Sequence, residues 1–434
     1  MSEQQPVGGF RPFFWLQALG AYNDNIYKQA VIILITYQSV RLGVDDPSIM
    51  VNLAAGLFIL PFMLFAAMAG QIADRMDKTV LIRRVKAAEV ALMLAATVAL
   101  FSDSIVLLLA VLMALGLQST FFAPVKYGVI PQLVGREQLM RANGLVNAAT
   151  NVAILLGSIL GGVLIAIEGY GPGSVALIGL VAALVGYALA RHLPSTVAQA
   201  PASRVNWNPL ISLWSTLSQL VRRRELFLVA LGISWFWFFG SVWFAQLPNF
   251  TREVLSGDER VAAMMFAVLI IGIGAGSVLC NHLARVSHGP GLVPFGALGL
   301  TLFGVLIWWL SGMLSPVDPM GVLAFVGRAG SWWVILALLM LGVSAGFYIV
   351  PLYSLVQIRA RSDHRARVFG AINILNALFM VMAALAAMAL FNADWSIREV
   401  LLATAVTSAV FTAVLVVLDG EFIRSARSLL LGRR

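Results

Sequence analysis

About twelve long apolar runs dominate this sequence, and they constrain its fold more than any other feature. A helix that crosses the hydrocarbon core of a bilayer needs about 20 predominantly apolar residues, and most runs reach that length. Of the 434 residues, 60% are hydrophobic and only 11% are charged, which excludes an ordinary soluble domain. The sequence therefore predicts an all-α membrane protein with about twelve transmembrane helices.

The breaks between the runs divide the chain into two sets of six helices. We predict helices over residues 12–40, 48–72, 79–101, 104–127, 138–167, 171–191, 226–251, 259–281, 291–313, 331–355, 366–391 and 396–419. A hydrophilic segment separates the two sets. The predicted organisation is a six-helix bundle at 1–191, a cytoplasmic linker at 192–224 and a second six-helix bundle at 225–434.

The two halves share a weak internal similarity. Pro124 lies near the predicted end of the fourth helix, and Gly144 and Asn147 open the fifth. In the second half, Pro351 and then Gly370 and Asn373 occupy the corresponding places. Together with the equal number of helices, this repetition indicates an internal duplication, as in many transporters.

Positive charges are unequally distributed between the loops. With twelve helices, 23 of the 29 Lys and Arg residues fall on the side shared by both termini, five fall on the other side, and Lys28 lies inside the first helix. Cytoplasmic loops carry the excess of Lys and Arg, so both termini are predicted to be cytoplasmic. The net charge of +9 is then a topological signal and not a sign of nucleic-acid binding.

The linker contains a helix signal of its own. Asn208 and Pro209 suit the N-cap and first position of a helix. Apolar residues then recur at helical spacing: Leu210, Leu213, Trp214, Leu217 and Leu220. This pattern predicts an amphipathic helix on the cytoplasmic membrane surface, against anionic lipid. The alternative is that the segment is the solvated start of the seventh transmembrane helix.

The first helix carries a polar cluster in an otherwise apolar run. Within the stretch Gln17–Ala30 lie Asn23, Asp24, Asn25 and Lys28. A charge at the centre of a spanning helix costs about 2.5–3.5 kcal/mol on insertion scales, so it should face a cavity or a partner. Asp24 and Lys28 are four residues apart and can pair on one helix face. Either they neutralise each other structurally, or the helix lines a polar pathway with Asp24 as its central ligand.

The segment Gly70–Arg84, GQIADRMDKTVLIRR, follows the second helix. It resembles the signature loop of the major facilitator superfamily. Gly70 would allow close helix approach, Asp74 can accept from amides at a neighbouring helix N-terminus, and Arg75 and Arg84 can pair with carboxylates. These residues are a candidate conformational switch; the alternative is that their charges are only topological.

Four further stretches are similar to bacterial lysophospholipid transporters of this superfamily, including those fused to acyltransferases. They are QALGAYNDNIYKQA, FFAPVKYGVIPQL, RANGLVNAATNVAILLGSILGG and GFYIVPLYSLVQIRAR. The resemblance implies the major facilitator fold, a bacterial inner (plasma) membrane location and inward movement of lysophospholipids, chiefly lysophosphatidylethanolamine. Family members carry a buried Arg in the seventh helix, whereas this chain is uncharged from Ser234 to Pro248, which leaves the head group open.

The residues themselves are compatible with a lipid substrate. A zwitterionic head group needs an anion, here Asp24, and a cation, here Lys28 or Lys126. Lys126 can instead extend to the membrane interface. The full candidate substrate site contains Gln17, Asn23, Asp24, Asn25, Lys28, Lys126, Asn147, Asn373, Trp237 and Trp243. For the last four the alternatives are structural: asparagines bonding between helices, and tryptophans in an interface belt.

We predict a monomeric secondary transporter for lysophospholipids that works by alternating access. Cys280 is the only cysteine, the four histidines lack metal-ligand spacing, and no catalytic triad or nucleotide loop is present. No enzyme activity, metal or cofactor is therefore expected. Two alternatives stay open: a proton-coupled exporter of amphipathic drugs, and a non-transporting sensor or scaffold for a membrane-associated acyltransferase.

Overall fold

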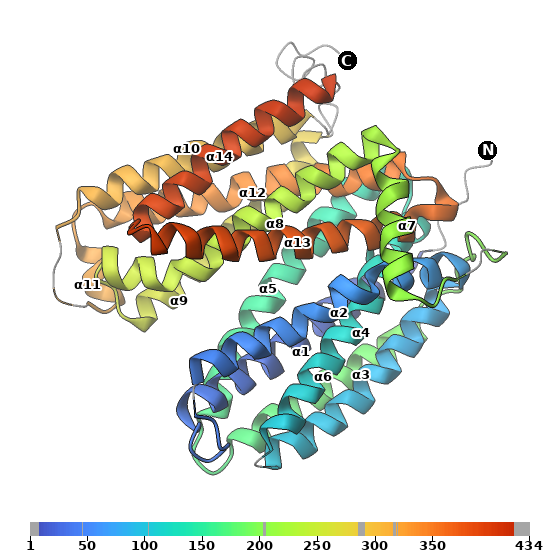
Figure 1. The fold of residues 1–434 in the computed structure, drawn as a ribbon, viewed down its shortest axis with the longest axis horizontal. Coiled ribbons are helices and arrows are strands. Elements are labelled where there is room, and N and C mark those ends of the chain that lie inside the picture. Colours follow the sequence, from blue (N-terminus) through green and yellow to red (C-terminus); the bar gives the residue numbers. More distant parts are fainter. Residues whose placement is uncertain are drawn as a thin grey trace. The chain divides into compact units, whose positions relative to one another are not determined.

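A computed structural model describes residues 8–45, 47–102, 104–202, 205–284, 291–315, 318 and 320–420. These residues form fourteen α-helices (Figure 1). Their bounds are α1 (Phe10–Tyr37), α2 (Pro47–Arg75), α3 (Lys78–Phe101), α4 (Ile105–Leu133), α5 (Leu139–Ile165), α6 (Gly171–Arg191), α7 (Pro209–Val221), α8 (Arg224–Asn249), α9 (Glu259–Ala284), α10 (Leu292–Gly312), α11 (Val322–Gly327), α12 (Ser331–Arg359), α13 (Arg365–Asn392) and α14 (Ile397–Leu418).

The prediction of about twelve transmembrane helices is confirmed. Apart from α7 and α11, each described helix has 21 to 29 residues and corresponds to one predicted span. Ten of these are long and apolar enough to cross a membrane by length and composition. The two others, α1 and α3, are also long, but they carry the polar cluster of the first helix and the charges of Arg83 to Glu89.

Several helices extend further than the sequence predicts, most of all α4 and α12. The fourth was expected to end at residue 127 but runs to Leu133, through Pro124 and Pro131. The tenth predicted transmembrane helix, α12, continues through Pro351 to Arg359. Proline removes one backbone hydrogen bond, but a buried or lipid-facing backbone has few other partners, so the helix continues around it.

The described chain forms two compact units. Unit 1 comprises Met1–Leu139, Val152–Arg222 and Gln357–Ile374, and unit 2 comprises Met140–Asn151, Arg223–Val356 and Leu375–Arg434. Helices α5, α12 and α13 therefore each contribute segments to both units. The predicted division around a linker at 192–224 stays a prediction.

Helix packing follows the same pattern in each unit. In unit 1, α6 packs against α1 and α3; in unit 2, α14 packs against α8 and α10 (Figure 1). Two glycines at corresponding positions of the two units each allow a close approach between helices. A Cβ atom on Gly144 of α5 would overlap the Ser277 carbonyl of α9, and one on Gly370 of α13 would overlap the Ala66 carbonyl of α2. These equivalent close approaches support the internal duplication inferred from the sequence.

The core of unit 1 encloses the middle of α1. Buried side chains of α1, including Ile26, Tyr27 and Val31, join a cluster with residues of α3, α4 and α6. On another side, the backbone of α1 at Ile26 lies against Gly161 of α5, where a Cβ atom would overlap the Ile26 carbonyl. The polar residues of α1 are thereby held inside the helix bundle of unit 1.

The linker forms a helix separate from α8. The Asn208 side chain accepts from the backbone amides of Leu210 and Ile211 at 3.1 and 3.2 Å, and Pro209 occupies the first turn of α7. Helix α8 begins only at Arg224. The helix signal is thus confirmed, and the alternative that this segment starts the seventh span is wrong.

Candidate substrate site

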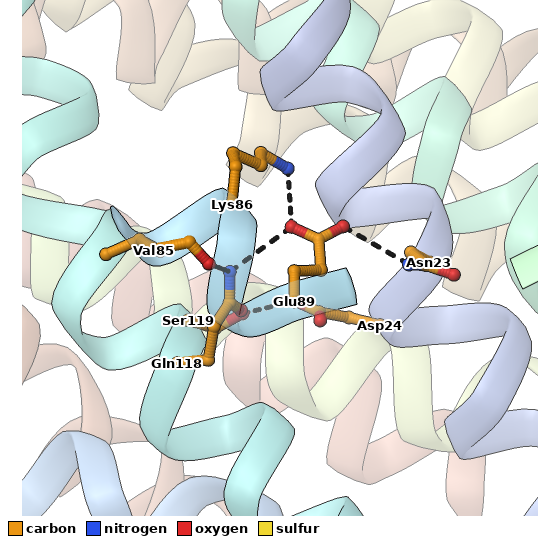
Figure 2. Close-up of polar contacts among 7 residues, drawn as sticks. All are labelled: Asn23, Asp24, Val85, Lys86, Glu89, Gln118 and Ser119. Atoms are coloured by element: carbon orange, nitrogen blue, oxygen red, sulfur yellow. Dashed lines mark hydrogen bonds and ion pairs between the residues drawn. The ribbon is translucent and has the colours of Figure 1, made fainter. Parts of the chain in front are cut away.

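A buried polar cluster joins α1, α3 and α4 within unit 1 (Figure 2). Its centre is Glu89, whose carboxylate accepts from Asn23 Nδ2 at 3.2 Å, Lys86 Nζ at 2.6 Å and Gln118 Nε2 at 3.2 Å. Lys86 and Glu89 are each only 1% exposed. A buried charge pair is tolerated when further hydrogen bonds satisfy it, as they do here.

The packing around Lys86 is adapted to its ammonium group. Its Nζ atom lies 5.3 Å from the centre of the Phe122 ring, in cation–π contact. Gly20 of α1 provides room, since a Cβ atom there would lie 2.6 Å from Lys86 Nζ, and Gly186 of α6 flanks the same side chain. The lysine is therefore accommodated by several helices and does not simply extend from α3.

Asp24 lies beside this cluster with one oxygen occupied. Ser119 Oγ donates to Asp24 Oδ2, and the same hydroxyl lies 3.2 Å from Gln118 Oε1 (Figure 2). Among the described residues, Asp24 Oδ1 is buried without a hydrogen-bond partner. Because an unmade hydrogen bond to a buried acceptor is costly, this oxygen is available to a donor that enters the site. The side chain is 9% exposed.

Asp24 and Lys28, which can pair on one helix face, have other partners in the structure. Lys28 Nζ donates to Asn25 Oδ1 at 2.8 Å, and Asn25 Nδ2 in turn donates to the Ala21 carbonyl at 2.7 Å. The Lys28 ammonium also lies 5.5 Å from the centre of the Phe58 ring of α2. Asp24 is thus bonded to Ser119 of α4, and Lys28 to Asn25 of its own helix. A direct ion pair between Asp24 and Lys28 does not form in the described structure.

The remaining candidates in unit 1 are also buried or half-buried. Lys126 of α4 is buried with its ammonium 5.4 Å from the Tyr127 ring centre, which disfavours the alternative that it extends to the interface. Gln17 is buried in α1. Asn373 of α13 is half-buried, and its Nδ2 atom has no hydrogen-bond partner among the described residues.

Three candidates belong to unit 2. Asn147 donates to Ser277 Oγ at 2.9 Å, which is the structural bond between helices that the sequence left as an alternative. Trp237 Nε1 donates to Tyr353 Oη at 3.3 Å. Trp243 is fully buried and stacks on Phe239, with the ring centres 5.7 Å apart.

The candidate switch lies where α2 meets the start of α13, within unit 1. Buried Asp74 accepts from the backbone amides of Ala366 and Arg367, both at 2.9 Å, and the Arg367 guanidinium lies 3.8 Å away. A Cβ atom on Gly70 would lie 2.7 Å from the Ala366 carbonyl oxygen. The predicted acceptance by Asp74 of helix N-terminal amides is therefore observed.

The two arginines of the candidate switch do not make, among the described residues, the contacts with carboxylates that the sequence suggested. Arg75 and Arg84 are exposed, and neither forms an ion pair within the described part of the chain. Arg83 makes the helix contacts instead, donating to the carbonyl oxygens of Ala190 and Leu193 at 3.1 and 2.7 Å. Its charge thus lies at the C-terminal end of α6, where the helix dipole favours a cation.

Comparison with known proteins places this architecture in a family. Residues 13–384 match the family model described as Major Facilitator Superfamily. The chain belongs to the major facilitator superfamily. It is therefore a multi-pass secondary transporter and not an enzyme.

Named relatives and solved structures agree with this assignment. The chain is 26% identical over 374 residues to the lysophospholipid transporter LplT of Escherichia fergusonii, covering 82% of this chain and 81% of the relative. It is 27% identical over 373 residues to LplT of Escherichia coli O1:K1, with the same coverage. The human organic anion transporter MFSD10 superposes with a TM-score of 0.70 at 16% identity, over 95% of this chain and 100% of that one. The fucose:proton symporter FucP of E. coli also gives 0.70, at 12% identity, over 94% and 98%.

Sequence reasoning missed half of the buried cluster of this major facilitator protein. Lys86 and Glu89 are three residues apart, a spacing that predicts a local pair near the membrane interface. The pair forms, but both side chains are buried, and the bonds of Glu89 to Asn23 and Gln118 were not anticipated. Gln118 and Ser119 carried a signal, because they are two adjacent polar residues inside the apolar run of the fourth helix. Polar residues in membrane helices generally face the bundle interior, so this pair could have been included.

Proposed function

We propose that this transporter moves lysophospholipids, with lysophosphatidylethanolamine as the first candidate, by alternating access. One observation carries the proposal: Asp24 Oδ1 is a buried carboxylate oxygen that has no hydrogen-bond partner among the described residues, in the same unit as Lys28 and Lys126. Lys28 and Lys126 both interact electrostatically with Asp24. The similarity to transporters named for lysophospholipids supports the same substrate class.

The head group can be matched to these residues. A lysophosphatidylethanolamine head group carries an ammonium, which would donate to Asp24 Oδ1, and a phosphate, which would accept from Lys28 or Lys126. No charged residue lies in α8 from Ser234 to Pro248, so the phosphate partner is assigned to unit 1. Trp237 and Trp243 of unit 2 are proposed as apolar wall for the acyl chain.

The contact of Asp74 with α13 is proposed as the conformational switch. Its two charge-assisted bonds hold the first turn of α13 against α2. Alternating access requires at least two discrete arrangements of such helices, so these bonds would form in one arrangement and break in the other. We further propose that the protein lies in a bacterial inner membrane with both termini cytoplasmic, as the Lys and Arg distribution indicates.

A second candidate function is proton-coupled export of amphipathic compounds. The observation that favours it is the presence of two buried carboxylates, Asp24 and Glu89, connected through the side chains of Ser119 and Gln118. Buried carboxylates in membrane helices commonly serve as proton carriers. In that case Asp24 would bind a proton and not a lipid ammonium.

Transport in proteoliposomes distinguishes the two functions. Asp24→Asn keeps the size and hydrogen bonding of the side chain but removes its charge, and we expect it to abolish lysophosphatidylethanolamine uptake. Asp24→Glu should retain part of the activity. Asp45→Asn, a change at an exposed residue outside the cluster, is the matched control and should transport normally.

The outcome for Asp24→Asn decides the assignment. Unchanged lipid transport in a correctly folded variant contradicts Asp24 as the head-group ligand. Loss of drug export alone, seen only when a proton gradient is imposed, supports the second function. Thermal unfolding of each purified variant separates a loss of transport from a loss of fold.

A further inference from the structure

Helix α7 exposes large apolar side chains on the side that faces away from unit 1, in addition to the apolar residues with which it packs on the unit. Its outward side chains are large and apolar: Trp214 is 75% exposed, Leu210 is 67% exposed, and Ile211 is exposed as well. Its buried inward side chains are Ser212, Thr216 and Leu220, so the apolar residues are not confined to the side that packs on the protein. In water an amphipathic helix turns its apolar side toward the protein, so this arrangement fits a surrounding medium that is itself apolar.

The inward side of α7 is already occupied by unit 1. Helix α7 lies against α2 (Figure 1). Leu213 and Leu217 pack against Ala66 and Ala67 of α2 and against Ile374. Just before the helix, the backbone amide of Asn206 donates to Gln71 Oε1 of α2 at 2.8 Å. These contacts fix which side of α7 faces away from the unit. At 13 residues α7 is about 20 Å long, too short to cross a bilayer.

The charge of the linker indicates which kind of partner the outward side of α7 can bind. Between Arg191 and Arg224 the sequence contains no Asp or Glu. Three consecutive exposed arginines, Arg222, Arg223 and Arg224, follow directly after α7. A surface with apolar anchors, tryptophans and only positive charge is complementary to a layer of anionic head groups above acyl chains.

The position of α7 brings that layer within reach. The helix lies between the end of one spanning helix, α6 at Arg191, and the start of the next, α8 at Arg224. Because the segment that joins them is too short to cross a bilayer, both of these ends belong on the same side of the membrane. Tryptophan is enriched at the depth of the head groups, where its ring is apolar and its N–H is hydrated. Trp207 and Trp214 are both exposed on this segment.

We infer that α7 is a membrane-surface anchor. Its outward side chains Leu210, Ile211 and Trp214, together with the exposed Trp207 just before the helix, enter the interface of the lipid leaflet next to it. Arg222, Arg223 and Arg224 bind the phosphates of anionic lipids in the same leaflet. The linker is then a lipid-contacting element of unit 1 and not a free cytosolic connection.

Environment-sensitive fluorescence tests the anchor in the full-length protein. A single cysteine replaces Trp214, or Gln219 as the control, in a Cys280→Ser background, and carries a nitrobenzoxadiazole label in lipid nanodiscs. Gln219 is exposed on the same helix but is polar. We expect a blue-shifted label at position 214 that is quenched by brominated acyl chains and protected from iodide. The label at position 219 should be quenched by iodide.

Two results would overturn the anchor. One is equal iodide quenching at both positions. The other is protection at position 214 that develops only when cytosolic extract is added, which would indicate a protein partner instead of lipid.

The arginines are tested by lipid composition. In nanodiscs that contain phosphatidylglycerol, the blue shift at position 214 should exceed that in pure phosphatidylcholine. Changing Arg222, Arg223 and Arg224 together to Gln should remove this difference, whereas Arg252→Gln, at an exposed arginine on the predicted opposite side, should preserve it. A triple variant that keeps the full response to phosphatidylglycerol contradicts the assigned role of the arginines.

Discussion

The start of α13 and the start of α5 are held by different chemistry, although they occupy equivalent places in the two units. In unit 1, charged Asp74 binds two backbone amides of α13, and Gly370 of α13 packs on α2. In unit 2, Asn147 of α5 donates to Ser277 of α9, and Gly144 packs against the same residue. The steric design is shared, but only the unit 1 contact carries charge.

This difference indicates which contact can act as a switch. A hydrogen bond to a charged group contributes about 1.5–3 kcal/mol, and a neutral one about 0.5–1.5 kcal/mol. Forming or breaking the α13 contact therefore changes the free-energy difference between two arrangements more than forming or breaking the α5 contact does. A second neutral bond, from Asn143 to Ser354 of α12 at 3.2 Å, makes the α5 contact broader but no more sensitive to charge. The duplicated halves have thus diverged in chemistry while keeping their packing.

The largest expected effect comes from removing the charge of the α13 contact. Asp74→Ala leaves the amides of Ala366 and Arg367 without their acceptor, and we expect a loss of about 3 kcal/mol in stability. Transport should fall strongly while expression and membrane insertion persist. Transport rates and thermal unfolding of the purified protein measure both effects. Unchanged transport kinetics would show that this contact is not part of the switch.

An intermediate effect is expected from crowding either contact. Gly370→Ala places a methyl group against the Ala66 carbonyl, and Gly144→Ala places one against the Ser277 carbonyl. Overpacking of this kind costs about 1–3 kcal/mol, and we expect similar losses at both sites because the steric design is shared. Gly56→Ala, where a Cβ atom would meet nothing within 4 Å, serves as the control. A large loss at only one site would refute the proposed equivalence.

The smallest effect is expected at the neutral contact. Asn147→Ala removes one amide–hydroxyl bond and should lower stability by about 1 kcal/mol. Transport should change much less than in Asp74→Ala. Thr150→Ala, one turn further along α5, tests whether any loss reflects general weakening of that helix. If Asn147→Ala abolished transport in a stable protein, Asn147 would have to be assigned to the substrate and not to helix packing.

The sequence by itself determined the helices of this transporter. Apolar runs of sufficient length and the Asn208–Pro209 helix start depend on local pattern, and the structure bears them out. The acceptor role of Asp74 was expected from the resemblance to the signature loop and not from local pattern, because its partners lie 292 and 293 residues away. Hydropathy predicts spans well because a buried or lipid-facing backbone must satisfy its own hydrogen bonds within the segment. That constraint acts over about 20 residues, within reach of a single apolar run.

Only the tertiary structure decided which polar side chains meet. Spacing along α1 showed that Asp24 could pair with Lys28, but the observed partner of Asp24 is Ser119 of α4, 95 residues later in the sequence. Spacing along α3 showed one partner of Glu89 and missed two. The spacing of the apolar residues of α7 likewise predicted that they share one face of the helix. In the structure, Leu213 packs inward while Trp214 is exposed. Helical spacing states which residues share a side of one helix, whereas burial and hydrogen bonding depend on which other helices pack there.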